Sequence, residues 1–446
     1  MKQAQHSREV GLLRALIPGV EILPPVQPHQ FTQEFLQAER IAIAQPDNDR
    51  LIVIRKPSTG AFFEFLDGLV SRSPAMARGT IFADVRTELM KILADYVGRD
   101  AALIGPSDVT ALDAHFEEWF VRLATPRRVF VPCVISPWAA PRFSVGPADF
   151  VFIDDLLSSD FYPPAQDLLG RYEFERMLDS MKEGRANWLA RISVEGCERF
   201  KAEEIGALSA ALAIVALQLA IPLPWGTRNM GRLDTRRGLA ERRTISESGG
   251  FYVGSWSRME PGISIGSGTL ADALQSTMPV IKAVGSLVKS FATGQYRLPR
   301  LERAWCDAAY WLHEALVENI DTIAIVKLET ALEVLMRAGS TSGSQARLEA
   351  ILSTFYGVNP GDPVTSESVT TAKQFAKGIV GDRSQILHGT RSTLHSHLAM
   401  SRNGVEMFVI EVVRRAAGEL ERYANSPAPR DDLDSFLAWV GARQEP

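Results

Sequence analysis

One short stretch near the C-terminus, Gly381 to Gly389, carries residues that could act on a phosphodiester. Arg383 is permanently cationic and can hold a phosphate through two N–H groups. His388 has an ordinary pKa near neutrality, so it can take and return a proton. Cleavage without a metal needs both kinds of group. Arginine and histidine five apart are common, however, and residue types alone favour a surface arginine and a histidine near a helix end that stops at Gly389.

A helical stretch would place these side chains around one groove. Ser384 and His388 are four residues apart and therefore share a helix face. Arg383 lies about 140° around the helix from His388, at about 100° per residue, so both can border one groove without both pointing into it. A hydrogen bond from Ser384 to the imidazole or to the backbone would complete the group. The predicted catalytic residues are therefore Arg383, Ser384 and His388.

Basic residues near this stretch, and one basic run far from it, are candidate RNA contacts. The run from Gly226 to Arg243 is followed by Tyr252 and Trp256, and cations with aromatic side chains can bind a nucleic-acid backbone. A solvated loop or hairpin with ordinary charges is the commoner structure for such a run. The candidate contacts are Lys377, Arg391, His395, Arg236 and Arg237.

No metal and no cofactor is expected. His395 and His397, together with His388, could be read as a metal cluster, but histidines without cysteines and with few carboxylates nearby are weak ligand candidates. A loop after the helix is the favoured interpretation. The glycine-rich stretch from Gly262 to Gly268 lacks the spacing and the lysine of a phosphate-binding loop, so a turn is expected there.

Composition indicates a globular protein of two or three domains. The chain has 446 residues, of which 46% are hydrophobic and 23% charged, enough to bury a sizeable core. The net charge of −5 excludes a bulk nucleic-acid binder, so any RNA contact has to be local. Three widely spaced cysteines are expected to be buried free thiols in a reducing compartment, which favours a cytoplasmic protein. They are Cys133, Cys197 and Cys306.

One uncharged stretch, Ile205 to Pro224, is long enough to span a membrane. Glu203 and Glu204 stand directly before it, and a helix that is apolar all round is equally a buried core helix. The N-terminus lacks the charged and apolar regions of a signal peptide. We therefore expect a buried helix over residues 203–221 and no membrane association.

The fold class predicted from these patterns is an α+β N-terminal region, of helices with a small mixed sheet, followed by an all-α bundle of four or five helices. Residues 1–125 are expected to be mostly helical, and residues 126–297 to be an α+β sensor or regulatory region. Residues 298–425 would form the bundle, and residues 426–446 a tail with a short helix.

Periodicity supports the N-terminal assignments. Apolar residues recur every three or four positions in Ile81–Val97 and Ser107–Leu123, as in amphipathic helices. Short runs rich in β-branched and aromatic residues predict strands. These strands are Leu51–Ile54, Arg128–Ile135, Phe150–Ile153 and Trp188–Val194.

The C-terminal part has an almost continuous helical pattern, broken by a predicted turn at Gly339–Ser344. Antiparallel helices joined by short loops form a bundle, here with its boundary near Tyr296–Pro299. The predicted helices are Leu301–Leu316, Ile320–Met336, Arg347–Phe355, Ser366–His388, Arg402–Tyr423 and Asp432–Val440.

This bundle resembles a HEPN domain, most closely the ApeA-like branch, over roughly Leu301 to Ala424. Thr330-Ala331-Leu332-Glu333 is similar to an "ALE" pattern of that branch, which makes Glu333 a structural motif residue. Arg383-Ser384-(x3)-His388 is similar to the family's R-x4-6-H motif, and the whole Arg383–Gly389 context resembles that branch. Ser384 departs from the family, in which asparagine or aspartate is frequent at this position.

The resemblance implies a metal-independent endoribonuclease of a defence or toxin-like system. Its partners would be RNA, with transfer RNA among the candidates, and a second copy of the chain, since HEPN bundles typically dimerise with two motifs lining one cleft. An unknown trigger would act at the N-terminal region, because a constitutive RNase harms its host.

Two alternatives remain at this stage. The first is a non-catalytic HEPN-type scaffold for dimerisation or nucleotide binding. Burial of Arg383 or His388, or an ion pair that occupies Arg383, would favour it, whereas an open cleft between two motifs would favour the nuclease. The second is a membrane-associated effector that uses Ile205–Pro224.

Overall fold

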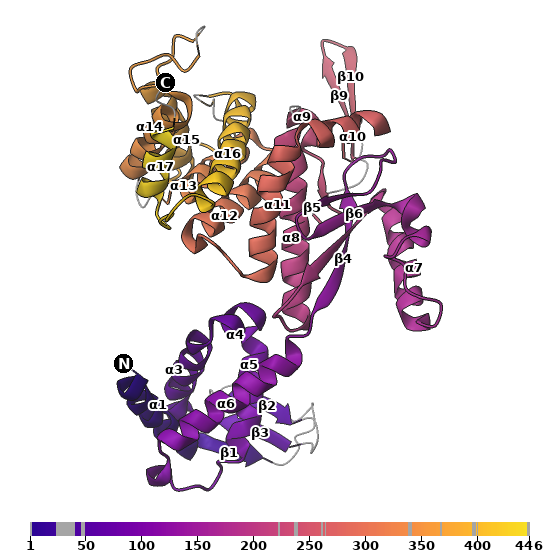
Figure 1. Ribbon diagram of the computed structural model, residues 1–446. Helices are drawn as coiled ribbons and strands as arrows, with labels where there is room; N and C mark the ends of the chain where they lie inside the picture. The colour runs from indigo at the N-terminus through magenta and orange to yellow at the C-terminus, as the bar shows by residue number, and fades with distance from the viewer. Residues whose placement is uncertain are drawn as a thin grey trace. The chain divides into compact units, whose positions relative to one another are not determined.

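The computed structural model describes residues 2–23, 41–45, 50–221, 224–235, 240–259, 262–263, 265–337, 341–365, 368–394, 398 and 400–443. It is a mixed α and β chain with small sheets before a helical C-terminal part (Figure 1), which confirms the coarse order predicted above. The chain divides into two compact units. One unit holds Met1–Arg127 and Val194–Glu204, and the other holds Arg128–Ser193 and Ile205–Pro446.

The N-terminal unit combines helices with a three-stranded antiparallel sheet of order β1-β3-β2. The predicted strand at Leu51–Ile54 is the centre of that sheet, where Ile54 lies opposite both Val20 and Ile41. The elements are α1 (Lys2–Leu16), η1 (Ile17–Gly19), β1 (Val20–Leu23), β2 (Ile41–Gln45), β3 (Arg50–Ile54), α3 (Lys56–Arg72), α4 (Pro74–Gly79), α5 (Phe82–Ala94), η3 (Ala101–Leu103) and α6 (Pro106–Leu123).

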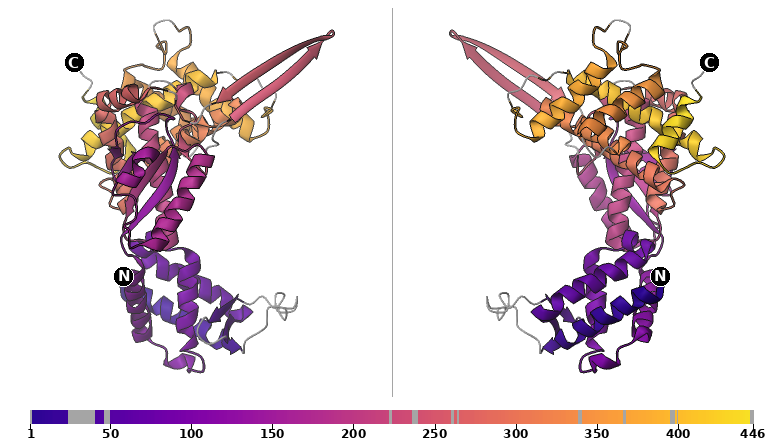
Figure 2. Two further views of the ribbon diagram at one scale, coloured as in Figure 1. Left: turned by 90° about the vertical axis from the view of Figure 1, so that its right-hand side faces the viewer. Right: turned by 90° about the vertical axis from the view of Figure 1, so that its left-hand side faces the viewer.

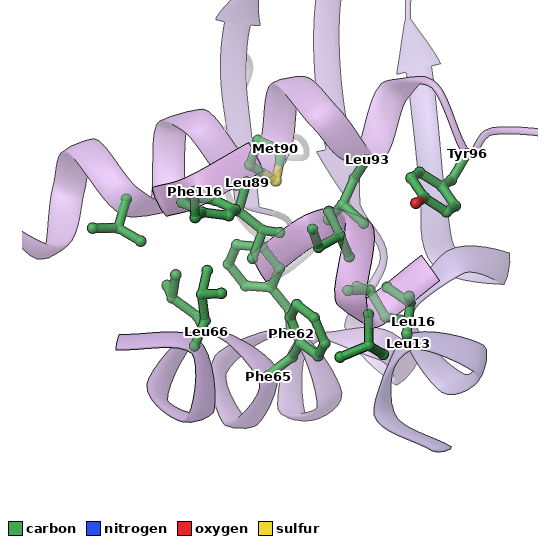
Figure 3. Close-up of a cluster of buried hydrophobic side chains, with 14 of the residues drawn as sticks. Leu13, Leu16, Phe62, Phe65, Leu66, Leu89, Met90, Leu93, Tyr96 and Phe116 are labelled. Carbon is green, nitrogen blue, oxygen red and sulfur yellow. The ribbon is translucent and has the colours of Figure 1, made fainter. Parts of the chain in front are cut away.

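One apolar cluster holds these helices together. Figure 3 shows Phe62 and Phe65 of α3 pointing toward Leu89 of α5 and Phe116 of α6, with side chains of α1 at the other end. The apolar spacing that predicted α5 and α6 is the face that each helix buries here. Burial of apolar surface is the dominant stabilising contribution in such a unit.

Phe62→Ala is expected to lower the unfolding free energy of the N-terminal unit by about 3–5 kcal/mol, because a fully buried ring leaves a cavity among close-packed neighbours. Phe63→Ala is the matched control, since its ring is 40% exposed on the same helix. Hydrogen exchange of peptides from residues 50–123 measures both. Equal losses for the two variants would contradict this account of the core.

The second unit begins with a five-stranded sheet of order β5-β6-β7-β4-β8. Its elements are β4 (Arg127–Val134), β5 (Phe143–Val145), β6 (Ala148–Phe152), η4 (Ile153–Ser158), α7 (Leu168–Glu183), β7 (Trp188–Val194), α8 (Arg199–Ala220), α9 (Pro224–Thr227) and β8 (Gly231–Arg232). The predicted strands at Arg128–Ile135, Phe150–Ile153 and Trp188–Val194 correspond to β4, β6 and β7.

Two glycines let this sheet approach the helices that follow it. Gly146, in the turn between β5 and β6, has φ +57°, and a Cβ there would lie 2.1 Å from the carbonyl oxygen of Gly285. Gly285 belongs to α11 (Met278–Thr293), which follows α10 (Ser267–Ser276). Side chains at either glycine would push the turn off the helix.

Helix α8 is the stretch whose composition raised the question of a membrane. It is long and apolar enough to cross a membrane, but 78% of its most apolar 18-residue segment is buried inside the protein. Gly206 packs against Val129 of β4, where a Cβ would lie 2.6 Å from the valine side chain. It is a core helix, as expected for residues 203–221.

From Pro299 onward, the regular elements among the described residues are helices. The helices are α12 (Pro299–Leu316), α13 (Asp321–Met336), α14 (Thr341–Tyr356), α15 (Ala372–Leu387), α16 (Arg402–Ala424) and α17 (Leu433–Gly441). Helix α15 packs on α13 and α14, and α16 packs on α11, α12 and α13.

The predicted boundaries of two helices in this region are wrong. Thr341 to Ser344, expected in a turn, already belong to α14. The helix expected from Ser366 begins only at Ala372, because Thr371 forms its N-terminal cap, and it ends at Leu387 rather than at His388.

A buried charge network fixes the start of α16. Glu406 is fully buried and accepts hydrogen bonds from Arg402, at 2.7 Å, and from Arg228, which follows α9. The Arg402 guanidinium also donates to the carbonyl oxygen of Leu316 at the end of α12. Because a buried charge without partners is strongly destabilising, these contacts determine where α16 begins against α12.

Candidate functional site

Helix α15 carries the candidate motif and is well defined at both ends. Thr371 and Gln374 form a reciprocal capping box, with N–H···O distances of 3.3 and 3.0 Å. Phe375 packs edge to face on Phe408 of α16, with ring centroids 5.0 Å apart. After Leu387 the chain turns at Gly389, which has φ +69° and so stops the helix.

Arg383 faces α13, where two carboxylates hold its guanidinium. Nη2 donates to Oε2 of Glu333 at 2.7 Å, and Nε lies 3.2 Å from Oε2 of Glu329. Glu333 also accepts a hydrogen bond from Ser344 of α14 at 3.4 Å. The arginine side chain stays 25% exposed, and in the described part of the chain no acceptor is paired with Nη1. One edge of the guanidinium is therefore fixed by the two carboxylates of α13.

Glu329 is the unusual member of this group. It is 1% exposed, and burial raises the pKa of its carboxyl to about 7, with Glu333 adding to the increase and Arg383 opposing it. Neither of its carboxylate oxygens accepts a hydrogen bond from the described residues. Its contact with Arg383 is thus an ion pair without hydrogen-bond alignment, and the carboxyl is partly protonated near neutral pH.

Ser384 and His388 lie where the helix ends. His388 is the C-cap residue, with φ −84° and ψ 2°, and its N–H donates to the carbonyl oxygen of Ser384 at 3.0 Å. The imidazole is exposed to solvent. Between the side chains of these two residues, both of which the structure describes, there is no hydrogen bond, so orientation of the histidine by the serine stays a prediction.

The predicted RNA contacts fall into two groups. Lys377 is exposed on α15. Arg391 lies just after the end of this helix, and its guanidinium is ion-paired with the buried Asp382. The backbone N–H of Arg391 donates to the carbonyl oxygen of Gln385 at 3.0 Å. The structure therefore brings these two to the helix that carries the motif. Arg236, Arg237 and His395 lie outside the described residues, as does His397.

Glu329 is the residue that the sequence analysis missed. It stands four positions before Glu333, so the two carboxylates share one face of a helix that is otherwise largely apolar on that side. A carboxylate on a buried face requires a cation from elsewhere in the chain. That spacing was the available signal for a partner of Arg383.

The described residues contain no group of three histidine, cysteine, aspartate or glutamate side chains placed to hold a metal ion. The three cysteines are free and buried, as predicted. Burial raises the pKa of Cys133 to about 12 and also raises that of Cys306, so neither is a thiolate nucleophile.

Comparisons of the chain with protein-family models, with curated protein sequences and with solved structures gave no match.

Glu329→Gln tests the charge assignment. The folded pKa of Glu329, about 7, lies above the ordinary value of 4.5, so the folded state holds the proton more tightly and stability falls as pH rises from 4.5 through 7. The variant lacks this contribution. Urea unfolding at pH 4.5 and 8 should show that wild type loses about 3 kcal/mol more than Glu329→Gln over this interval. Parallel curves for the two proteins would contradict a raised pKa.

Proposed function

We propose that the protein is a metal-independent endoribonuclease of a defence or toxin-like system, and that its C-terminal helices form a HEPN-type bundle. The proposal is carried by one observation. A single helix, α15, presents an arginine fixed by two carboxylates with Nη1 left over, and an exposed histidine at its end. The charge of the arginine suits a group that holds a phosphate, and the exposed imidazole suits a group that moves a proton.

The proposed reaction uses the RNA itself as nucleophile. His388 takes the proton of the 2′-hydroxyl, O2′ attacks the adjacent phosphorus, and the bond from phosphorus to O5′ breaks. The attack is intramolecular and gains the corresponding proximity advantage. The departing O5′ takes a proton, leaving a 2′,3′-cyclic phosphate and a 5′-hydroxyl.

One histidine cannot be base and acid at the same moment. A second copy of the chain would supply a second His388, so the proposal includes a homodimer through the bundle. Arg383 would stabilise the charge that builds up on the phosphate oxygens. The substrate is cellular RNA, with transfer RNA among the candidates, the compartment is the cytoplasm, and the N-terminal region receives the trigger.

A second candidate function is a non-catalytic HEPN-type scaffold. The ion pairs of Arg383 with Glu329 and Glu333 favour it, because they join α15 to α13 and occupy two of the three guanidinium nitrogens. The exposure of His388 favours the nuclease, since a purely structural bundle gains little from a solvated imidazole at a helix end. The two candidates therefore differ in what Arg383 does.

Cleavage of total and transfer RNA in EDTA tests the nuclease. Wild type should cut, and His388→Ala should lower the rate by at least about 10²-fold because the proton acceptor is gone. Arg383→Ala should lower it by about 10²–10³-fold through loss of charge stabilisation. End-group mapping should find cyclic phosphates.

Matched variants separate chemistry from folding. Gln385→Ala changes an exposed residue of α15, and Arg414→Ala removes an exposed arginine that is ion-paired on α16, so both should cut like wild type. Thermal melts of all variants show whether the bundle is intact. Cleavage retained by a folded His388→Ala protein, or no cleavage by wild type, would leave the scaffold as the better account.

A further inference from the structure

Strands β9 (Ala240–Ser248) and β10 (Phe251–Met259) form a two-stranded sheet of their own. They are joined by Gly249 and Gly250, whose φ values of +60° and +84° are those of a type I′ turn. Figure 2 shows this hairpin projecting away from the helices of its own unit. A lone two-stranded hairpin is marginally stable in water, whereas three or more strands are the stable arrangement.

The hairpin exposes large apolar side chains, most of them on β10. Phe251, Tyr252, Val253 and Trp256 are each between 60% and 79% exposed. Successive side chains of a strand face opposite sides, so Phe251 and Val253 share one face of the hairpin and Tyr252 and Trp256 share the other. Both faces of β10 therefore carry exposed apolar side chains.

The two edges of the hairpin differ in charge. Four of the nine residues of β9 are charged, and charged edge strands resist pairing with other chains. In β10, Arg258 is the one charged residue of nine.

Self-pairing of β10 gives a register without like charges. In an antiparallel pair centred on Ser255, Arg258 lies opposite Tyr252 of the other copy, and Trp256 lies opposite Gly254. An aromatic residue across from a strand glycine is a known device for strengthening such a pair. This register brings no like charges together and sets an aromatic residue across from a glycine, which favours a second β10 as the occupant of this edge.

The hydrogen-bonding groups of β10 fit the same register. The type I′ turn makes Ser248 and Phe251 the closing pair of the hairpin. Because N–H and C=O groups alternate in an antiparallel ladder, those of every second residue from Tyr252 onward are directed to the outer edge. In the register centred on Ser255 these residues pair with one another, Tyr252 with Arg258 and Gly254 with Trp256.

We propose that the outer edge of β10 pairs with β10 of a second copy of this chain about a two-fold axis at Ser255. The product is a four-stranded antiparallel sheet of order β9-β10-β10-β9. This is strand addition in which main-chain hydrogen bonds give affinity and side-chain register gives specificity. The inference stands independently of ribonuclease activity.

A disulfide at the axis is the direct test. Ser255 and its copy would be a non-hydrogen-bonded pair with Cα atoms ~4.5 Å apart, within the range that a disulfide spans. Ser255→Cys should therefore give a covalent dimer on mild oxidation with oxidised glutathione. The native cysteines do not interfere, because all three are buried.

Thr244→Cys is the matched control, since Thr244 lies opposite Ser255 in the hairpin, is exposed like it and hydrogen-bonds to it. This variant should stay uncrosslinked. Equal crosslinking of the two variants, or no crosslinking of the Ser255→Cys protein, would overturn the proposal.

A charge exchange at the same position gives a second readout. Ser255→Lys and Ser255→Glu each place like charges side by side on the axis, so each variant alone should show faster hydrogen exchange than wild type at the outer-edge N–H groups of Tyr252, Gly254 and Trp256. A mixture of the two should return to the slow exchange of wild type. Equal exchange for Ser255→Lys and wild type would overturn the proposal, whatever the mass of the protein.

Failure of the nuclease is distinguishable from failure of this inference. A Ser255→Cys protein that crosslinks but does not cut RNA retains the β10 pairing and loses only the proposed activity. If the protein cuts RNA, but its Ser255→Cys variant does not crosslink and Ser255→Lys does not change the hydrogen exchange of β10, only the pairing is lost.

Discussion

The contact of Arg383 with Glu329 and Glu333 is the interaction on which the C-terminal helices depend. Glu329 is buried and can be tolerated there only beside a cation or as a neutral acid. The first solution places Arg383, and with it α15, against α13. The position of His388 follows, because it caps the end of the same helix. The packing of α15 on α13 and the geometry of the candidate site thus share one charge cluster.

This cluster also connects the proposed activity with its control. Two carboxylates orient the guanidinium, but they also compete with a phosphate for its charge. Protonation of Glu329 near neutral pH removes one competitor, and a displacement of α13 would remove both. In the proposed ribonuclease, Glu329 is the competitor whose charge depends on pH near neutrality, and its Oε2 lies 3.2 Å from Nε of Arg383.

Much of the fold follows from periodicity, and much of the site does not. The helices at Ile81–Val97 and Ser107–Leu123 were predictable because each buries one apolar face, and α8 because it is apolar all round. Helix α11 was missed although its apolar residues recur at helical spacing. Glu329 was missed because a buried ion pair depends on a partner 54 residues away in the chain, which local patterns do not report.

The central claim is that RNA is cut by its own 2′-hydroxyl at the Arg383–His388 end of α15. The most direct measurement is cleavage, in EDTA, of an RNA that carries one 2′-deoxynucleotide at a mapped cut site. The account predicts that this bond alone becomes resistant while neighbouring sites are still cut, because the nucleophile has been removed there. Cleavage at the deoxy position at the ordinary rate would contradict the account.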